Sequence, residues 1–140
     1  MKKYLIFLLL APLLLAFTCD EDADINYDKL NELGILGEWE INSETINGIS
    51  DLTVQCCKFI EFLPDSNNED FNGLFTFNDD PSQSYNGVFT VDPTNQVITF
   101  QRDGNEDVVY SYTINGSQDT LSFTFTENDA IFEQNWVKIN

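Results

Sequence analysis

The side chains that most often carry enzyme chemistry are unevenly represented in this chain of 140 residues. It contains 24 Asp and Glu, three cysteines and no histidine. Without histidine, triads that use an imidazole base and most catalytic zinc sites are excluded. Glu38 and Glu40 flank Trp39, but alternation in a strand places both carboxylates on the opposite face, toward solvent. No glycine-rich phosphate loop or nucleophile elbow occurs in the sequence. We therefore expect no enzyme, no catalytic residues, no cofactor and no metal site.

One cysteine stands where another chemistry, covalent attachment of a lipid, is expected. Lys2 and Lys3 precede a continuous apolar run from Tyr4 to Phe17, and Cys19 follows closely. Because about 20 apolar residues are needed to cross the hydrocarbon core of a membrane, this run is too short for a transmembrane helix. A positive start, a short apolar centre and small residues before a break indicate a secretory signal peptide, here residues 1–18.

The segment Leu15-Ala16-Phe17-Thr18-Cys19 resembles the lipobox of bacterial lipoproteins, in which the cysteine becomes the lipidated first residue of the mature chain. That family usually has Gly, Ala or Ser where Thr18 stands here. The resemblance implies a membrane anchor of two or more acyl chains on Cys19, since one chain alone binds membranes only marginally. The alternative is an ordinary cleaved signal peptide with a cysteine nearby by chance.

An acidic segment, Asp20-Glu21-Asp22-Ala23-Asp24, follows this cysteine. Acidic runs remain solvated, so we expect a tether over residues 19–27. The segment resembles the signal that sends lipoproteins of the Bacteroidota to the outer face of the outer membrane. This resemblance implies a lipid-anchored protein of the outer membrane, at its periplasmic face or at the cell surface. A calcium loop is the other interpretation, but Ile25 stands where an EF-hand needs glycine at its sixth position.

The charge of the chain limits its partners. The 6 Lys and Arg against 24 Asp and Glu give a net charge of −18, and loss of Lys2 and Lys3 with the signal peptide leaves 4 against 24, or −20. Nucleic-acid binding depends on clustered basic residues, so this composition argues against it. An acidic surface favours solubility and attracts basic partners, which keeps a protein partner open as an alternative.

The remaining cysteines, Cys56 and Cys57, are adjacent in a predicted strand, where neighbouring side chains point to opposite faces. A disulfide between them would need a strained small ring, although an oxidising compartment permits it. We expect one of the two to be a small buried residue and the other to face the opposite side. Two cysteines without histidine make a poor zinc site, which needs four nitrogen or sulfur ligands.

After about Tyr27 the sequence predicts one domain, residues 28–140, built from short strands joined by turns. Residues 121–126 alternate strictly between apolar and polar side chains, which is typical of a half-buried strand. A helical turn is predicted over Asp28–Leu33, ended by Gly34. The predicted strands are Leu36–Thr45, Thr53–Leu63, Asn72–Asn78, Tyr85–Val91, Gln96–Arg102, Asp107–Ile114, Thr120–Thr126 and Ile131–Ile139.

Short links rich in Asn, Asp and Gly separate most of these strands. Asp103-Gly104 and Asn115-Gly116 supply the positive φ angles of tight hairpins, and such short links require antiparallel neighbours. Longer polar loops are predicted at Asp65–Asp70 and Asp79–Ser84. Eight sequential antiparallel strands favour an all-β, up-and-down barrel, which leaves no exposed sheet edge.

The start of the first predicted strand carries a family motif. Gly37 and Trp39 resemble the Gly-x-Trp motif of lipocalins and of the shorter lipocalin-like domains in bacterial lipoproteins, and Trp136–Ile139 is similar to their closing strand. The resemblance covers about residues 28–139 and implies a lipocalin-like barrel in which the tryptophan plugs one end. The chain departs from the family in two respects. It has no helical pattern after the barrel and no arginine to stack on Trp39, for which Lys138 is the nearest basic candidate.

An eight-stranded barrel is either filled by its own side chains or just wide enough for one small ligand. Two functions therefore stay open. The first is a membrane-anchored barrel that binds a small apolar ligand at the cell envelope, and the second is an acidic protein-interaction module with a filled barrel. The sequence identifies no ligand-contacting residue. The phenylalanines that could either fill or line the barrel are Phe59, Phe62, Phe71, Phe75, Phe77, Phe89, Phe100, Phe123, Phe125 and Phe132.

Overall fold

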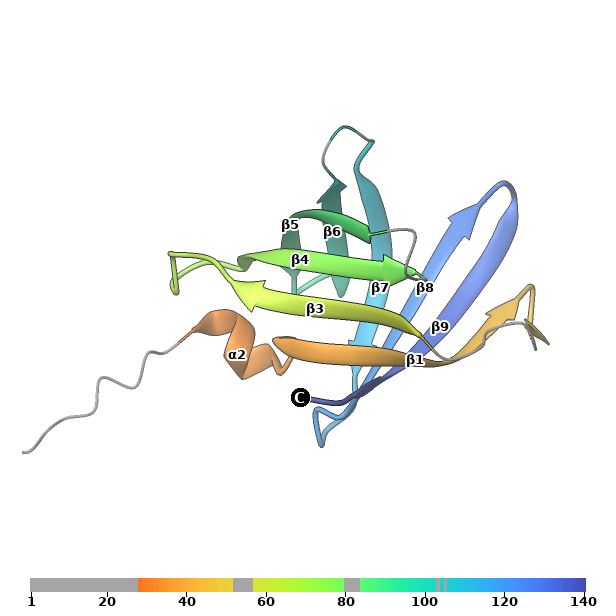
Figure 1. Ribbon diagram of the computed structural model, residues 1–140, viewed down its shortest axis with the longest axis horizontal. Coiled ribbons are helices and arrows are strands. Elements are labelled where there is room, and N and C mark those ends of the chain that lie inside the picture. Colours follow the sequence, from red (N-terminus) through yellow and green to blue (C-terminus); the bar gives the residue numbers. More distant parts are fainter. Residues whose placement is uncertain (1–27, 52–56, 80–83, 103, 105) are drawn as a thin grey trace, which may run out of the picture.

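The computed structural model describes residues 28–51, 57–79, 84–102, 104 and 106–140 (Figure 1). This part of the chain contains one short helix and nine strands, each antiparallel to its neighbours. The predicted signal peptide, the lipidation site Cys19 and the acidic tether lie outside the described residues.

Eight of the strands form a closed barrel. Each pairs with the next, and the first pairs with the last from Trp39↔Lys138 to Ile46↔Phe132, which closes the sheet on itself. The all-β, up-and-down barrel predicted from the sequence is thereby confirmed. The barrel strands are β1 (Gly37–Ile46), β3 (Lys58–Pro64), β4 (Asn72–Asp79), β5 (Ser84–Asp92), β6 (Val97–Arg102), β7 (Val108–Ile114), β8 (Thr120–Glu127) and β9 (Ala130–Lys138).

The predicted strand ends agree with the observed ones to within one residue, except at the start of β3. That strand was predicted from Thr53 but begins at Lys58, and residues 52–56, with Cys56, lie outside the described residues. Cys57 is exposed and has a φ of 96°, which an extended strand does not adopt, so the prediction that it lies within the strand is wrong. The short strand β2 (Ile49–Ser50), which pairs with the end of β1, was not predicted.

Alternation along the strands directs every second side chain into the barrel. These inward side chains are mostly large and apolar, and they form one continuous core. Its strand residues are Trp39, Ile41, Ile60, Phe62, Phe75, Phe89, Val91, Ile98, Phe100, Tyr112, Leu121, Phe123 and Trp136.

The helix α2 (Lys29–Leu33) lies at the end of the barrel where β1 begins (Figure 1). The Asp28 carboxylate accepts a hydrogen bond from Leu30 N at 2.8 Å and so caps the start of the helix. Gly34, in the left-handed conformation at φ 75°, ends it. Leu30 and Ile35 are almost completely buried, so this helix and the turn after it close that end of the barrel.

Trp39 lies directly beneath this closure and is fully buried. Its Nε1 donates a hydrogen bond to Ile35 O at 2.9 Å. Lys138 Nζ lies 5.1 Å from the centre of the Trp39 ring and donates a hydrogen bond to Gly34 O at 3.0 Å. The predicted roles of Trp39 as the plug of one end and of Lys138 as the cation above it are confirmed.

Two inward-facing glycines let neighbouring strands and rings approach closely. A Cβ atom on Gly87 of β5 would lie 2.1 Å from Gln101 O of β6 and 2.9 Å from Phe75 Cε1. A Cβ atom on Gly73 of β4 would lie 2.5 Å from Phe89 Cε1. The absence of a side chain at both positions therefore allows two phenylalanine rings to fill the core.

We expect Gly87→Ala to lower the free energy of unfolding by about 1–3 kcal/mol, because the added methyl group overlaps a backbone oxygen of β6. Gly116→Ala is the matched control, since a Cβ atom there meets no atom within 4 Å. Urea unfolding followed by tryptophan fluorescence measures both variants. Equal unfolding free energies for the two would contradict the close approach at Gly87.

Candidate functional site

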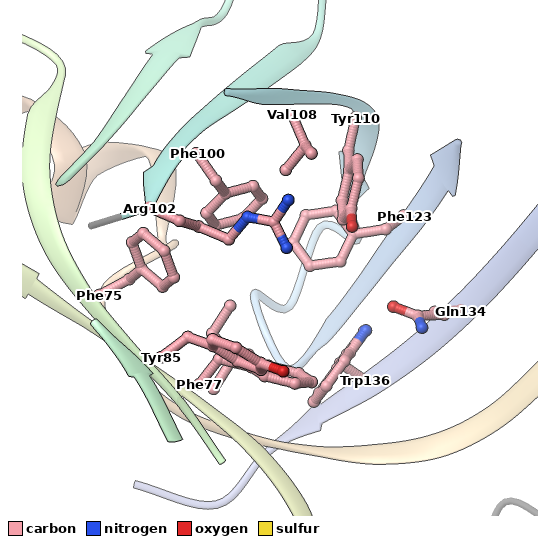
Figure 2. Close-up of a pocket in the computed structure, with 11 residues that line it drawn as sticks. Phe75, Phe77, Tyr85, Phe100, Arg102, Val108, Tyr110, Phe123, Gln134 and Trp136 are labelled. Carbon is pink, nitrogen blue, oxygen red and sulfur yellow. The ribbon is translucent and has the colours of Figure 1, made fainter. Parts of the chain in front are cut away.

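The interior of the barrel is filled in one half and hollow in the other. Toward α2, the rings of Phe62 and Phe89 pack edge to face with their centres 4.9 Å apart. Toward the opposite end, side chains from seven strands surround a cavity of about 110 Å³ (Figure 2). Its lining residues are Ile60, Phe75, Phe77, Tyr85, Phe100, Arg102, Val108, Tyr110, Phe123, Gln134 and Trp136.

The size and the walls of this cavity suit a small apolar body. An engineered cavity of about 150 Å³ in another protein binds benzene, so a space of this order accepts one aromatic ring. Phe75 and Phe100 meet edge to face on one wall, with ring centres 4.9 Å apart. The ring of Phe125 stacks on the rings of Tyr110 and Phe132, with ring centres 4.1 Å and 5.1 Å apart. These contacts extend the aromatic surface from the cavity toward the end of the barrel opposite α2.

Arg102 brings a positive charge into this aromatic space. It continues the inward series of Ile98 and Phe100 on β6, and its guanidinium points into the cavity (Figure 2). Its Nε is buried and has no hydrogen-bond partner among the described residues. To the described residues, the head group donates one long hydrogen bond, 3.5 Å from Nη2 to Glu106 O. The charge is thus largely unpaired within the described part of the chain.

A second donor faces the same cavity from β9. The indole Nε1 of Trp136 is buried and, within the described ranges, has no acceptor. A buried donor left without a partner costs about 1–3 kcal/mol. Both unpaired groups are hydrogen-bond donors, so the cavity is suited to a group that accepts hydrogen bonds.

A buried carboxylate lies at the edge of this region. Glu44 is 7 % exposed, and Gln134 Nε2, whose side chain lines the cavity, donates a hydrogen bond to its Oε2. Strict alternation from Ile41 would turn Ser43 inward. A register shift between Ile41 and Ser43 in the pairing with β9 turns Glu44 inward instead. The carboxylate therefore has a hydrogen-bond partner among the described residues, whereas Arg102 Nε and Trp136 Nε1 have none.

The charged groups around the cavity act on Tyr110. Burial raises the pKa of Tyr110 above its ordinary value of 10.0. The charge of Arg102 opposes this effect, and the carboxylates of Glu127 and Glu44 add to it. Tyr110 is therefore a neutral phenol in the folded protein at physiological pH.

Of the phenylalanines that the sequence named as able to fill or line the barrel, Phe75, Phe77, Phe100 and Phe123 line the cavity. A signal for Arg102 was available, because Ile98, Phe100 and Arg102 alternate within one predicted strand. No sequence signal pointed to Glu44, since its orientation depends on the register shift. The one site residue that the sequence named, Cys19, lies outside the described residues.

Metal binding and membrane spanning each need a particular arrangement of residues. The described residues contain no group of three or more Cys, Asp or Glu side chains placed to hold a metal ion. None of their helices has the length and apolar character needed to span a membrane.

Tyr110 is expected to ionise only above the ordinary pKa of a tyrosine, because burial disfavours the phenolate. The pKa of Tyr110 is higher in the folded protein than in the unfolded chain. Tyr110 therefore contributes to the free energy of unfolding below pH 10.0, and this contribution is lost as the pH rises through the folded-state pKa. Ultraviolet absorbance of phenolate, compared between the wild type and Tyr110→Phe, measures this ionisation. If the phenolate transition that the wild type shows and Tyr110→Phe lacks lies at or below pH 10.0, the raised pKa of Tyr110 is contradicted.

Comparison with known proteins agrees with this architecture. A family model described as a lipocalin-like domain matches residues 35–123, which contain β1, the strands β3 to β7 and the start of β8. No curated protein matches the chain. The family match extends over more than half of the sequence and includes most of the cavity wall. Together with the closed barrel of eight antiparallel strands, it shows that the chain belongs to the family of lipocalin-like domains.

Proposed function

We propose that this chain is a lipid-anchored lipoprotein of the bacterial cell envelope whose barrel binds a small apolar ligand and catalyses no reaction. The aromatic cavity at the open end carries the binding proposal. It has room for about one ring, and its walls come from seven strands of one rigid sheet. Pockets of this kind, apolar with a few polar groups, are typical of small-molecule sites.

The cavity favours ligand binding over an acidic interaction module with a filled barrel. The half of the interior next to α2 is filled by buried side chains such as Phe62 and Phe89, whose ring centres lie 4.9 Å apart. The other half keeps a space of about 110 Å³ beside unpaired donors. Lost packing and unpaired donors both destabilise a fold, so a bound molecule explains this half better than a structural role does.

The anchor and the location are proposed from the sequence. Lys2 and Lys3, the apolar run and Cys19 support export and acylation, and the acidic segment behind Cys19 supports the outer membrane. An anchor at Cys19 joins the barrel through α2, at the end opposite the cavity opening. The point of attachment and the cavity therefore lie at opposite ends of the barrel.

Ligand binding is tested by tryptophan quenching with 4-bromobenzyl alcohol, a neutral single-ring quencher, on the full chain in zwitterionic lipid nanodiscs. The chain has two tryptophans, and Trp136 lines the cavity whereas Trp39 lies at the closed end. We expect saturable quenching in Trp39→Phe, which keeps Trp136, and none in Trp136→Phe. Equal, unsaturable quenching in both variants would contradict a binding cavity.

The anchor is tested by metabolic labelling with an alkyne fatty acid in a lipoprotein-processing bacterial host. Cys19→Ala is expected to abolish the label, because no other residue can start the lipidated chain. Cys57→Ala, which removes an exposed thiol near the barrel, is the matched control and should keep full labelling. Undiminished labelling of Cys19→Ala would refute the lipoprotein proposal.

A further inference from the structure

We infer that the ligand of the cavity carries a carboxylate, which accepts hydrogen bonds from Arg102 and from the indole N–H of Trp136. Its apolar body, about the size of one ring, lies among the phenylalanine side chains. This inference rests on the proposed binding function and adds to it the chemical class of the ligand.

The first argument is that both unpaired groups are donors on one cavity. Arg102 enters from β6 and Trp136 from β9, and Figure 2 shows the guanidinium and the indole nitrogen facing the same space. Neither the Nε of Arg102 nor the Nε1 of Trp136 has an acceptor among the described residues. A ligand with acceptor oxygens offers hydrogen-bond partners to these unpaired donors.

The second argument is that Arg102 differs from the other described cations. Lys58 Nζ lies 3.6 Å from Asp79 Oδ1, and Lys138 Nζ is held by Gly34 O above a tryptophan ring. Both of these cations serve the barrel itself. Lys29 and Lys138, like Arg102, form no ion pair with a described residue, but among the described cations Arg102 alone lines the apolar cavity.

The third argument concerns which acceptor group fits. A guanidinium binds carboxylates through paired, charge-assisted hydrogen bonds, which are stronger than bonds to a neutral oxygen. Apolar walls such as Phe75 and Phe123 lower the local dielectric constant and strengthen this attraction. A cationic ligand fits less well, because the guanidinium of Arg102, which lines the cavity, repels it.

The test uses three planar compounds of nearly equal size that differ in charge, namely benzoate, benzamide and benzamidinium. Their dissociation constants are measured by isothermal titration calorimetry on the full chain in zwitterionic nanodiscs, with empty nanodiscs as the blank. We expect benzoate to bind at least about tenfold more tightly than benzamide, and benzamidinium to bind most weakly.

Two variants assign the preference to Arg102. Arg102→Met, which keeps an apolar stem and loses the charge, should bring benzoate to within about twofold of benzamide while benzamide binding itself is kept. Benzamide binding then shows that the cavity is intact. Lys29→Met is the matched control, since it removes one positive charge at the closed end, and it should keep the wild-type order.

The outcomes separate this inference from the proposed function. If benzamide or benzamidinium binds the wild type as tightly as benzoate, the cavity binds ligands but the carboxylate assignment is overturned. A benzoate preference that persists in Arg102→Met also overturns it. If Arg102→Met does not fold, the order of the three dissociation constants on the wild type still tests the carboxylate assignment. Failure of all three compounds to bind the wild type counts against the inference. Quenching by the neutral bromobenzyl alcohol then judges the proposed function separately.

Discussion

The pairing of β1 with β9 is the interaction on which the rest of the structure depends. It runs from Trp39↔Lys138 to Ile46↔Phe132 and turns an open sheet into a closed barrel. At one end the pairing brings Lys138 over Trp39, and at the other it brings Gln134 to the Glu44 carboxylate. These contacts join residues about a hundred positions apart, so both the plugged end and the edge of the cavity exist only because the barrel closes.

The two ends of the barrel differ in packing and in hydrogen bonding. The end near α2 is closed by buried apolar side chains, and the polar groups there are paired with the backbone, as Trp39 Nε1 is with Ile35 O. The other half carries a cavity and two buried donors without described partners. Natural folds tend to break packing and pairing rules at functional sites, and they offset the cost elsewhere. The well-packed closed end is the part of this molecule that can offset it.

The sequence predicted the strands well because their pattern is local. Alternation and turn residues place strand ends to within one residue wherever a strand follows a compact turn. The prediction of the start of β3 was wrong because the residues from Thr53 onward resemble a strand in sequence. Cys57, however, has a backbone conformation that no strand uses. The roles of Trp39 and Lys138 were also predictable. The family motif indicates the role of Trp39, and the sequence has few basic residues besides Lys138 that could lie above its ring.

The sequence by itself determined the all-β class of the fold, its antiparallel strands and the shared face of Ile98, Phe100 and Arg102, because alternation and short turns depend only on neighbouring residues. Closure of these strands into a barrel depended on the pairing of β1 with β9. Tertiary structure decided whether the barrel is filled or hollow. Cavity volume depends on how side chains from seven strands share one space, and the same phenylalanines could have filled it. It also decided the position of Glu44, because a register shift in β1 reverses the faces that alternation predicts. The site thus combines a locally encoded cation with a space and a carboxylate that only the closed sheet can create.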